Sequence, residues 1–237
     1  MERAEALAAL VSTARSCVIR RSETYPLDRK RVHKWQRGRL KPELVMGKLI
    51  LNAAVTVNGA FEAPVPEPNG WFVLDPESTQ ASLEKWQAAD AMVLGRKTYE
   101  GLAAVWPQLA AVPGYEAYAH RMNSMLKYVA SRTLKSPLTW GASLLHGELA
   151  ESVRRIKEEH HGNLIVSGAG ELARTLVREN LVDEVWFTVY PYLWPTGPRI
   201  LDEVVATRLE LISTETYASG VVQLCYRCAH SGTPSDR

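Results

Sequence analysis

The 237-residue sequence contains few cysteines and no long apolar run. Its three cysteines, Cys17, Cys225 and Cys228, are too sparse for a disulfide framework and are typical of a reducing compartment. No stretch approaches the roughly 20 apolar residues of a membrane span. The apolar run at 6–11 is also too short for the core of a signal peptide. We therefore expect a cytoplasmic protein that has no membrane partner.

Cys225 and Cys228 form a single Cys-x-x-Cys pair, and the sequence offers no second pair of metal ligands beside it. The surrounding segment 221–228 has the pattern of a β-strand, in which residues three apart point to opposite faces. This arrangement favours buried or edge thiols over a metal or redox centre. No metal is expected.

Basic residues are concentrated in the first 45 positions. Residues 1–45 contain eleven Lys or Arg and five Asp or Glu, a net +6, so the overall charge of +2 leaves −4 for the remainder. Three interpretations stay open: an arm that binds phosphate-rich polymers, a poorly ordered extension, or a stretch translated ahead of a start at Met46. Because nothing else in the chain indicates a nucleic-acid module, nucleic acid is not the expected partner.

From residue 46 onward, short β-prone runs alternate with helical stretches. This alternation predicts one α/β domain at 46–237, with a mostly parallel central sheet, flanking helices and an antiparallel C-terminal hairpin. The expected strands are 48–57, 91–94, 126–130, 163–167, 183–190, 207–217 and 221–229. The expected helices are 78–89, one that follows Lys97, 115–124, 148–159 and 170–179. Ser78 is the expected N-cap of the first of these helices.

The segment Gly95-Arg96-Lys97-Thr98-Tyr99-Glu100 stands directly between a buried strand and a helix. At such a junction the first helical N–H groups are unpaired, and the positive end of the helix dipole favours an anion. Gly95 allows close backbone approach, Thr98 offers a hydroxyl, and Arg96 and Lys97 supply positive charge. These features predict a phosphate site, with a plain helix cap and surface charges as the alternative.

Two further strand ends have the same character. The first carries Ser131, Arg132 and Thr133, and the second carries Val166, Ser167, Gly168, Ala169, Gly170, Glu171 and Leu172. A small-residue turn that opens a helix can hold a pyrophosphate through backbone N–H groups. Because the carboxyl ends of parallel strands lie along one edge, three such ends together favour a nucleotide site.

Several of these motifs resemble one known family. Segment 95–100 is similar to the signature of dihydrofolate reductases. Segments 127–134 and 167–172 resemble bacterial dihydrofolate-reductase-like proteins related to the reductase domain of riboflavin biosynthesis. Segments 54–59 and 190–199 resemble the family's first strand and its late proline- and glycine-containing segment. The resemblance covers about 46–229 and implies NADPH-dependent hydride transfer to a small pterin- or pyrimidine-like heterocycle.

The resemblance also implies roles for individual residues. Arg96, Lys97 and Thr98 would hold phosphates, including the 2′-phosphate of adenosine, together with Ser131 and Arg132, and residues 167–171 would wrap the pyrophosphate. Ala53 and Ala54 would leave room for the nicotinamide, with ordinary core packing as the alternative. The implied substrate contacts are Asn58, Trp71 and Tyr190. Family members commonly dimerise, and the apolar C-terminal strands would leave a long edge, so a homodimer is expected.

The sequence departs from the family where the substrate would bind. Thr56-Val57-Asn58-Gly59 stands where the riboflavin enzymes have Ser-Leu-Asp-Gly, and Thr79 stands where dihydrofolate reductases have a helix carboxylate. Asp75 and Glu77 are the candidate proton donors, with helix capping as their alternative role. The loop 61–71 is the expected lid. The departures leave the substrate open, and they keep a nucleotide-binding sensor without turnover as the alternative function.

Overall fold

The computed structural model describes residues 47–61, 70–73, 75–112, 114–202, 204 and 206–229. The basic segment 1–45 and most of the expected lid lie outside these residues. The strands are β1 (Leu49–Thr56), β2 (Ala89–Gly95), β3 (Leu126–Ala130), β4 (Ala142–Leu144), β5 (Asn163–Ser167), β6 (Glu184–Tyr190), β7 (Leu209–Thr216) and β8 (Val222–Cys228). The helices are α2 (Pro76–Gln87), α3 (Arg96–Leu109), α4 (Glu116–Ser124), α5 (Leu149–Glu159) and α6 (Glu171–Arg178).

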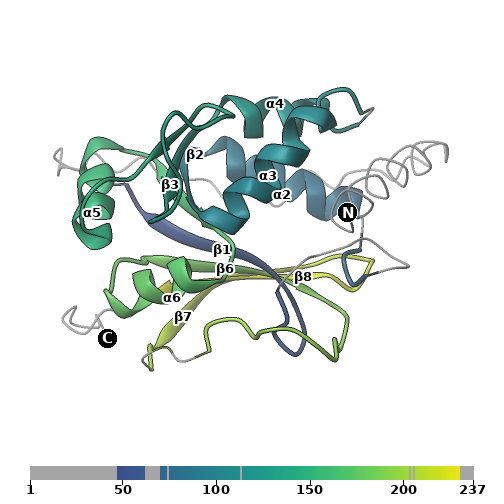
Figure 1. Cartoon of the computed structure of the whole chain (residues 1–237). Helices are drawn as coiled ribbons and strands as arrows, with labels where there is room; N and C mark the ends of the chain where they lie inside the picture. The colour runs from purple at the N-terminus through teal and green to yellow at the C-terminus, as the bar shows by residue number, and fades with distance from the viewer. Residues whose placement is uncertain are drawn as a thin grey trace, which may run out of the picture.

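The eight strands form one sheet in the order β4-β3-β2-β5-β1-β6-β8-β7 (Figure 1). From β4 to β6 in this order the strands are parallel to one another, whereas β8 is antiparallel to both β6 and β7. The predicted α/β class, with its mostly parallel sheet and antiparallel C-terminal hairpin, is confirmed. The short strand β4 was not expected from the sequence.

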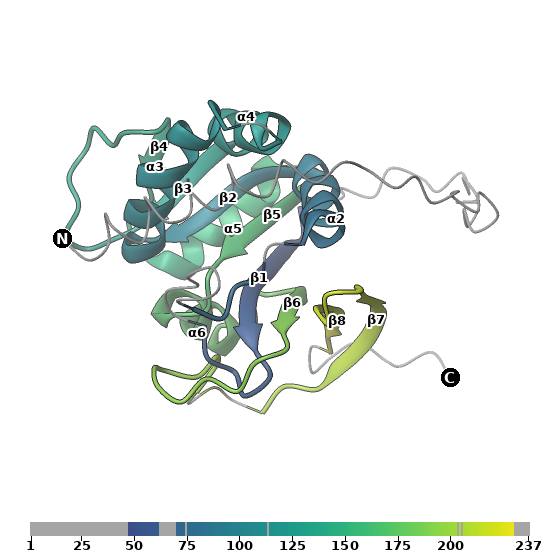
Figure 2. The same cartoon turned by 90° about the vertical axis from the view of Figure 1, so that its right-hand side faces the viewer.

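Helices cover the centre of the sheet on both faces. On one face, α2, α3 and α4 contribute Trp86, Tyr99 and Met122 to a cluster with apolar side chains of β2, β3 and β5. On the other face, α5 and α6 contribute Val153 and Leu176 to a second cluster with β1, β2 and β5 (Figure 2). The central strands are therefore buried on both sides, which explains why their sequences are nearly continuous apolar runs.

Helix α2 begins earlier than the sequence indicated. Its N-cap is Asp75, whose Oδ1 accepts hydrogen bonds from the backbone N–H groups of Glu77 (2.8 Å) and Ser78 (2.9 Å). The expectation that Ser78 caps this helix is wrong, because Asp75 followed by Pro76 supplies a better cap and a proline at the first helical position.

The two C-terminal cysteines behave as the strand pattern predicted. Cys225 and Cys228 are free, buried thiols on β8. Burial raises the pKa of both thiols, that of Cys228 to about 11. They are therefore poor nucleophiles, as expected for thiols packed in a core. Across the part of the chain that the structure describes, none of the helices has the length and apolar character needed to cross a membrane.

Candidate functional site

The site is positioned by the neighbouring parallel strands β2 and β5, whose following helices lie on opposite faces of the sheet. Helix α3 follows β2 and packs on the face that carries α2 and α4, whereas α6 follows β5 and packs on the face that carries α5 (Figure 2). In open α/β sheets, such a switch point leaves a crevice outside the carboxyl ends of the strands. The carboxyl ends of β2 and β5 are therefore the expected position of a ligand.

Both helices begin at a glycine. Gly95 is the N-cap of α3 and Gly170 the N-cap of α6, and neither helix start receives a side-chain capping hydrogen bond. By contrast, Asp75 fills this role for α2. The first N–H groups of α3 and α6 are thus not claimed by a capping side chain, and they lie at the positive ends of the two helix dipoles. Such groups can bind an anionic oxygen.

The turn after β5 lies directly against the first turn of α3. Gly168 has φ +94°, and a Cβ built on it would lie 2.9 Å from Oγ1 of Thr98. The backbone N–H of Gly168 donates to the carbonyl of Asn52 on β1 (3.1 Å). Only glycine meets the conformational and steric demands of this position, so the residue draws the two helix starts and β1 together.

The other residues of this turn are buried or half-buried. Val166 and Ala169 are buried, and Ser167 and Gly170 are half-buried. The Leu172 side chain lies 3.7 Å from the point that a Cβ on Gly95 would occupy, so α6 packs closely on the end of β2. We expect these residues to act through their backbone and packing rather than through reactive side chains.

Charged side chains gather above the same edge. Arg96 forms an ion pair with Glu100 one turn along α3 (3.3 Å), and Arg132 forms one with Glu171 at the start of α6 (3.5 Å). All four side chains are exposed to solvent. Lys97 is exposed as well.

Residues 131–134, directly after β3, form a compact polar turn. The Ser131 hydroxyl oxygen accepts the backbone N–H groups of Thr133 (3.2 Å) and Leu134 (3.1 Å). This turn holds Arg132 outward, with a side chain that is 92% exposed. The sequence-predicted groups from three strand ends are thus brought to one edge.

Strand β1 continues past the end of β5. Its pairing with β5 stops at Asn52, whereas its pairing with β6 continues to Thr56. Ala53 packs with Ala169 in the turn before α6, while Ala54 faces the opposite side and packs against the aromatic cluster of Trp71 and Tyr190. The two alanines therefore lie on opposite faces of the sheet, Ala53 buried and Ala54 half-buried.

The three sequence-predicted substrate residues do not form one open surface. Trp71 and Tyr190 are buried, with ring centroids 5.4 Å apart in an edge-to-face arrangement. Burial raises the pKa of Tyr190. Asn58 is tied to the backbone of Trp194, accepting its N–H (3.0 Å) and donating to its carbonyl (2.9 Å). These contacts give all three residues a structural role, and their contact with a substrate stays a prediction.

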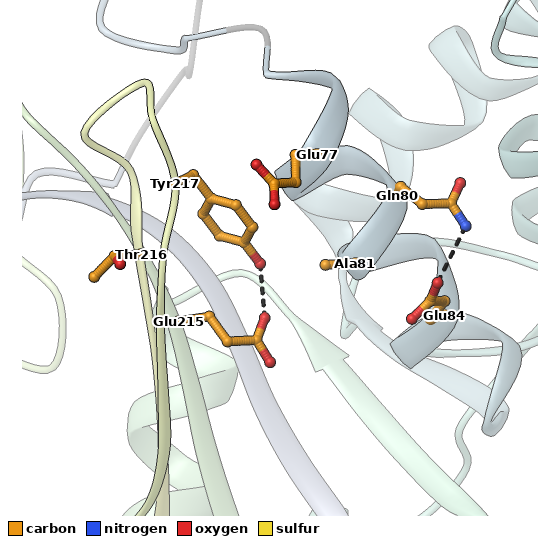
Figure 3. Close-up of a pocket in the computed structure, with 7 residues that line it drawn as sticks. All are labelled: Glu77, Gln80, Ala81, Glu84, Glu215, Thr216 and Tyr217. Atoms are coloured by element: carbon orange, nitrogen blue, oxygen red, sulfur yellow. Dashed lines mark hydrogen bonds between the residues drawn. The ribbon is translucent and has the colours of Figure 1, made fainter. Parts of the chain in front are cut away.

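The two candidate proton donors have different surroundings. Besides capping α2, Asp75 accepts a hydrogen bond from Ser219 in the turn between β7 and β8, so both of its carboxylate oxygens are engaged. Glu77 is exposed and lines an open groove between α2 and β7 (Figure 3). Their catalytic role stays a prediction.

The groove was missed in the sequence. Its walls come from two segments far apart in the chain: Glu77, Gln80, Ala81 and Glu84 on one side and Glu215, Thr216 and Tyr217 on the other (Figure 3). The Tyr217 hydroxyl donates to Glu215 (2.7 Å), and Tyr217 packs in the same aromatic cluster as Trp71 and Tyr190. No local motif could have signalled this arrangement.

Tyr99 is a second residue whose role the sequence did not reveal. Its hydroxyl accepts the backbone N–H of Thr139 (3.0 Å) and lies 2.9 Å from the Thr139 hydroxyl, so it anchors the first turn of α3 to the loop before β4. The partner is 40 residues away. The sequence shows Tyr99 within segment 95–100, but nothing in it indicates that Thr139 is the partner.

Comparison with known proteins identifies relatives over most of the chain. The family model of the RibD C-terminal domain matches residues 47–223. Two Bacillus subtilis (strain 168) proteins are similar over 180 residues each, or 76% of this chain. The uncharacterized protein YyaP is 26% identical, with 94% of its length covered. The uncharacterized protein YwjB is 23% identical, with 97% covered.

Solved structures show the same fold at low sequence identity. A protein assigned to riboflavin biosynthesis from Shewanella sp. PV-4 has a TM-score of 0.57 and 20% identity, over 77% of this chain and 99% of that one. RibD of Acinetobacter baumannii has a TM-score of 0.53 and 13% identity, over 78% of this chain and 58% of that one. The resemblance to dihydrofolate-reductase-like proteins related to the riboflavin reductase domain is confirmed. The chain belongs to the RibD C-terminal domain family.

Proposed function

We propose that the protein is an NADPH-dependent reductase that transfers a hydride to a small heterocycle of the pterin or pyrimidine kind. The observation that carries the proposal is the contact between two glycine-capped helix starts, those of α3 and α6, at the switch point of the sheet. The family assignment supports a reductase-type protein. A relative of the same fold from Corynebacterium diphtheriae, with a TM-score of 0.50 and 14% identity over 81% of this chain and 96% of that one, is described as pyrimidine reductase-like.

The residues at this edge fit the phosphates of such a cofactor. The N–H groups at the starts of α3 and α6 are suited to the pyrophosphate, and Thr98 adds a hydroxyl. Arg96 and Arg132, both exposed, are suited to the 2′-phosphate, since a guanidinium binds phosphate oxygens in pairs. The bound cofactor would supply the hydride.

The protein's own residues would orient the reactants and supply a proton. Ala54, half-buried near the end of β1 beside Trp71 and Tyr190, is small enough to pack against a flat ring, whereas Ala53 is buried in the core. Because Asp75 is already engaged in capping and in its contact with Ser219, Glu77 is the stronger candidate for proton donor.

The proposal is tested by comparing NADPH and NADH binding in the wild-type protein and in Arg96→Ala. Loss of a charge-assisted contact should weaken NADPH binding roughly tenfold to a hundredfold and leave NADH binding almost unchanged. Titration followed by nicotinamide fluorescence measures both. Arg155→Ala is the matched control, because Arg155 forms a similar pair with Glu159 on α5, away from this edge.

Equal losses for both nucleotides in Arg96→Ala would remove the 2′-phosphate role. If NADPH binds tightly but no pterin- or pyrimidine-like acceptor oxidises it, the alternative of a nucleotide-binding sensor replaces that of an enzyme. The observation that favours a nucleotide-binding sensor is that Asp75, one of the two candidate proton donors, is engaged in capping α2 and in its contact with Ser219.

A further inference from the structure

The ion pair between Arg132 and Glu171 joins two segments that are not adjacent in the sheet. Arg132 follows β3 and Glu171 opens α6, which follows β5. The strand between β3 and β5 is β2, at whose carboxyl end α3 begins. The ion pair therefore spans the carboxyl end of β2, at the edge that carries the candidate phosphate site.

The geometry of this pair is that of a contact that can be replaced. The Nη2 of Arg132 lies 3.5 Å from Oε1 of Glu171, and the two side chains are 92% and 72% exposed. Exposed pairs of this kind contribute little to stability, because solvent screens them and both side chains lose freedom. The pair therefore adds little to the stability of the fold, but it occupies the guanidinium of Arg132 with a carboxylate.

A carboxylate and a phosphate compete for the same guanidinium. Both present paired oxygens to its N–H groups, and the doubly charged phosphate is the stronger partner. Glu171 also places a negative charge in the first turn of α6, where it repels an incoming phosphate. The helix dipole stabilises an acid at this position, which accounts for an acid in the first turn but not for its pairing with a residue after β3.

We propose that Glu171 competes with the 2′-phosphate of the cofactor for the guanidinium of Arg132 and so lowers the affinity for NADPH. This inference rests on the proposed function. In the structure Glu171 pairs with Arg132, and a bound 2′-phosphate would take over the guanidinium. NADH has no such phosphate and leaves the pair intact.

The expected effect of Glu171→Gln is a gain of affinity. NADPH should bind about two- to fivefold more tightly, the range that corresponds to an exposed ion pair, while the affinity for NADH changes by less than about twofold. The gain should shrink as salt is added, because it comes from exposed charges. In the Arg132→Gln background the same substitution should give a clearly smaller gain, since the guanidinium that it releases is absent.

The experiment is a set of NADPH and NADH titrations on wild type, Glu171→Gln, Arg132→Gln and the double variant, at low and high salt. Glu159→Gln, which removes the exposed partner of Arg155 on α5, is the matched control and should change neither affinity. Thermal unfolding of each variant checks that all remain folded.

The outcomes separate this inference from the proposed function. If NADPH binding depends on Arg132 and Glu171→Gln leaves it unchanged, the competitor role is wrong and the reductase proposal stands. An equal gain for NADPH and NADH, or a full gain in the Arg132→Gln background, also overturns the competitor role. If the wild-type protein binds neither nucleotide at millimolar concentration, both proposals fail.

Discussion

At the scale of single residues, Gly168 determines how closely the turn after β5 can approach α3. Gly168→Ala places a Cβ 2.9 Å from Oγ1 of Thr98 at a φ of +94°. We expect a loss of about 2 kcal/mol in the free energy of unfolding, from strained backbone and from the clash. Denaturant unfolding measures the loss, and NADPH titration measures the accompanying loss of affinity.

A second substitution separates the two causes. Thr98→Ala in the Gly168→Ala background removes the colliding hydroxyl and should recover part of the stability, leaving the backbone strain. Gly101→Ala is the control, because nothing lies within 4 Å of its Cβ and it sits inside α3. There the same change should stabilise by about 0.5–1 kcal/mol. A Gly168→Ala protein as stable as wild type would show that the close approach is not needed.

Asp75 gives a prediction in which stability and rate respond differently. Asp75→Ala should cost about 1 kcal/mol because α2 loses its cap, whereas Asp75→Asn should keep nearly full stability because asparagine caps as well as aspartate. If Glu77 is the proton donor, Glu77→Gln should slow single-turnover NADPH oxidation by about 10²-fold, and Asp75→Asn should not. An unchanged rate in Glu77→Gln, measured with NADPH and an accepted substrate, would remove Glu77 from the mechanism.

The role of a single residue could be predicted from the sequence only where that residue belongs to a local motif. The helix start at 95–98 could be recognised because a glycine, two cations and a hydroxyl follow a buried strand without interruption. The pairing of Arg132 with Glu171 could not, since it depends on how strands 30 or more residues apart are ordered. The buried positions of Trp71 and Tyr190 depend in the same way on the packing of distant segments.

At the scale of elements, β3 is held by an unusual buried lysine. Lys127 is 2% exposed, its Nζ donates to the carbonyls of Asn123 (3.0 Å) and Met125 (2.6 Å), and the Trp140 ring lies 4.3 Å away. Burial, together with nearby Arg121, lowers the pKa of Lys127 from 10.5 to about 8. The ammonium therefore ties the end of α4 and the loop before β4 to β3.

This pKa shift predicts how stability changes with pH. Between pH 8 and pH 10.5 the unfolded chain still holds a proton at Lys127 that the folded protein has released. Because the unfolded state binds more protons there, the stability of the wild type relative to Lys127→Met should rise across this range. Urea unfolding at several pH values measures the difference, with exposed Lys135→Met as the control. Parallel pH profiles for wild type and Lys127→Met would contradict the prediction.

Elements with a strong pattern of their own were predicted well. β3 and β5 have the expected bounds, and β1 and α5 begin within one residue of expectation, because their apolar spacing alone decides the structure. β4 was missed because its three residues form a strand only by pairing with β3. The start of α2 was misjudged because several hydroxyl and acidic residues compete to cap it, and the backbone geometry decides among them.

At the scale of the whole molecule, β7 is the outermost strand of the sheet, and all eight of its residues are exposed. Leu209, Leu211 and Ile212 are 37%, 59% and 44% exposed. Long edges of this kind pair with another chain or are covered. We therefore predict a homodimer that contacts through β7, and that Leu211→Lys shifts it to a monomer in analytical ultracentrifugation at micromolar concentration.

Leu126→Lys is the control for this prediction, because Leu126 is a similarly exposed leucine (55%) on β3, away from β7. It should leave the dimer intact. A wild-type protein that sediments as a monomer at the same concentration would contradict the prediction.

The central claim is that a dinucleotide lies along the carboxyl edge of the sheet, with its pyrophosphate between the starts of α3 and α6. A crystal structure of the protein grown with NADPH tests this claim most directly. We predict density for the pyrophosphate beside Thr98 and Gly168, with the 2′-phosphate at Arg96 and Arg132. NADPH bound instead in the groove between α2 and β7, or anywhere else away from these helix starts, would contradict the account.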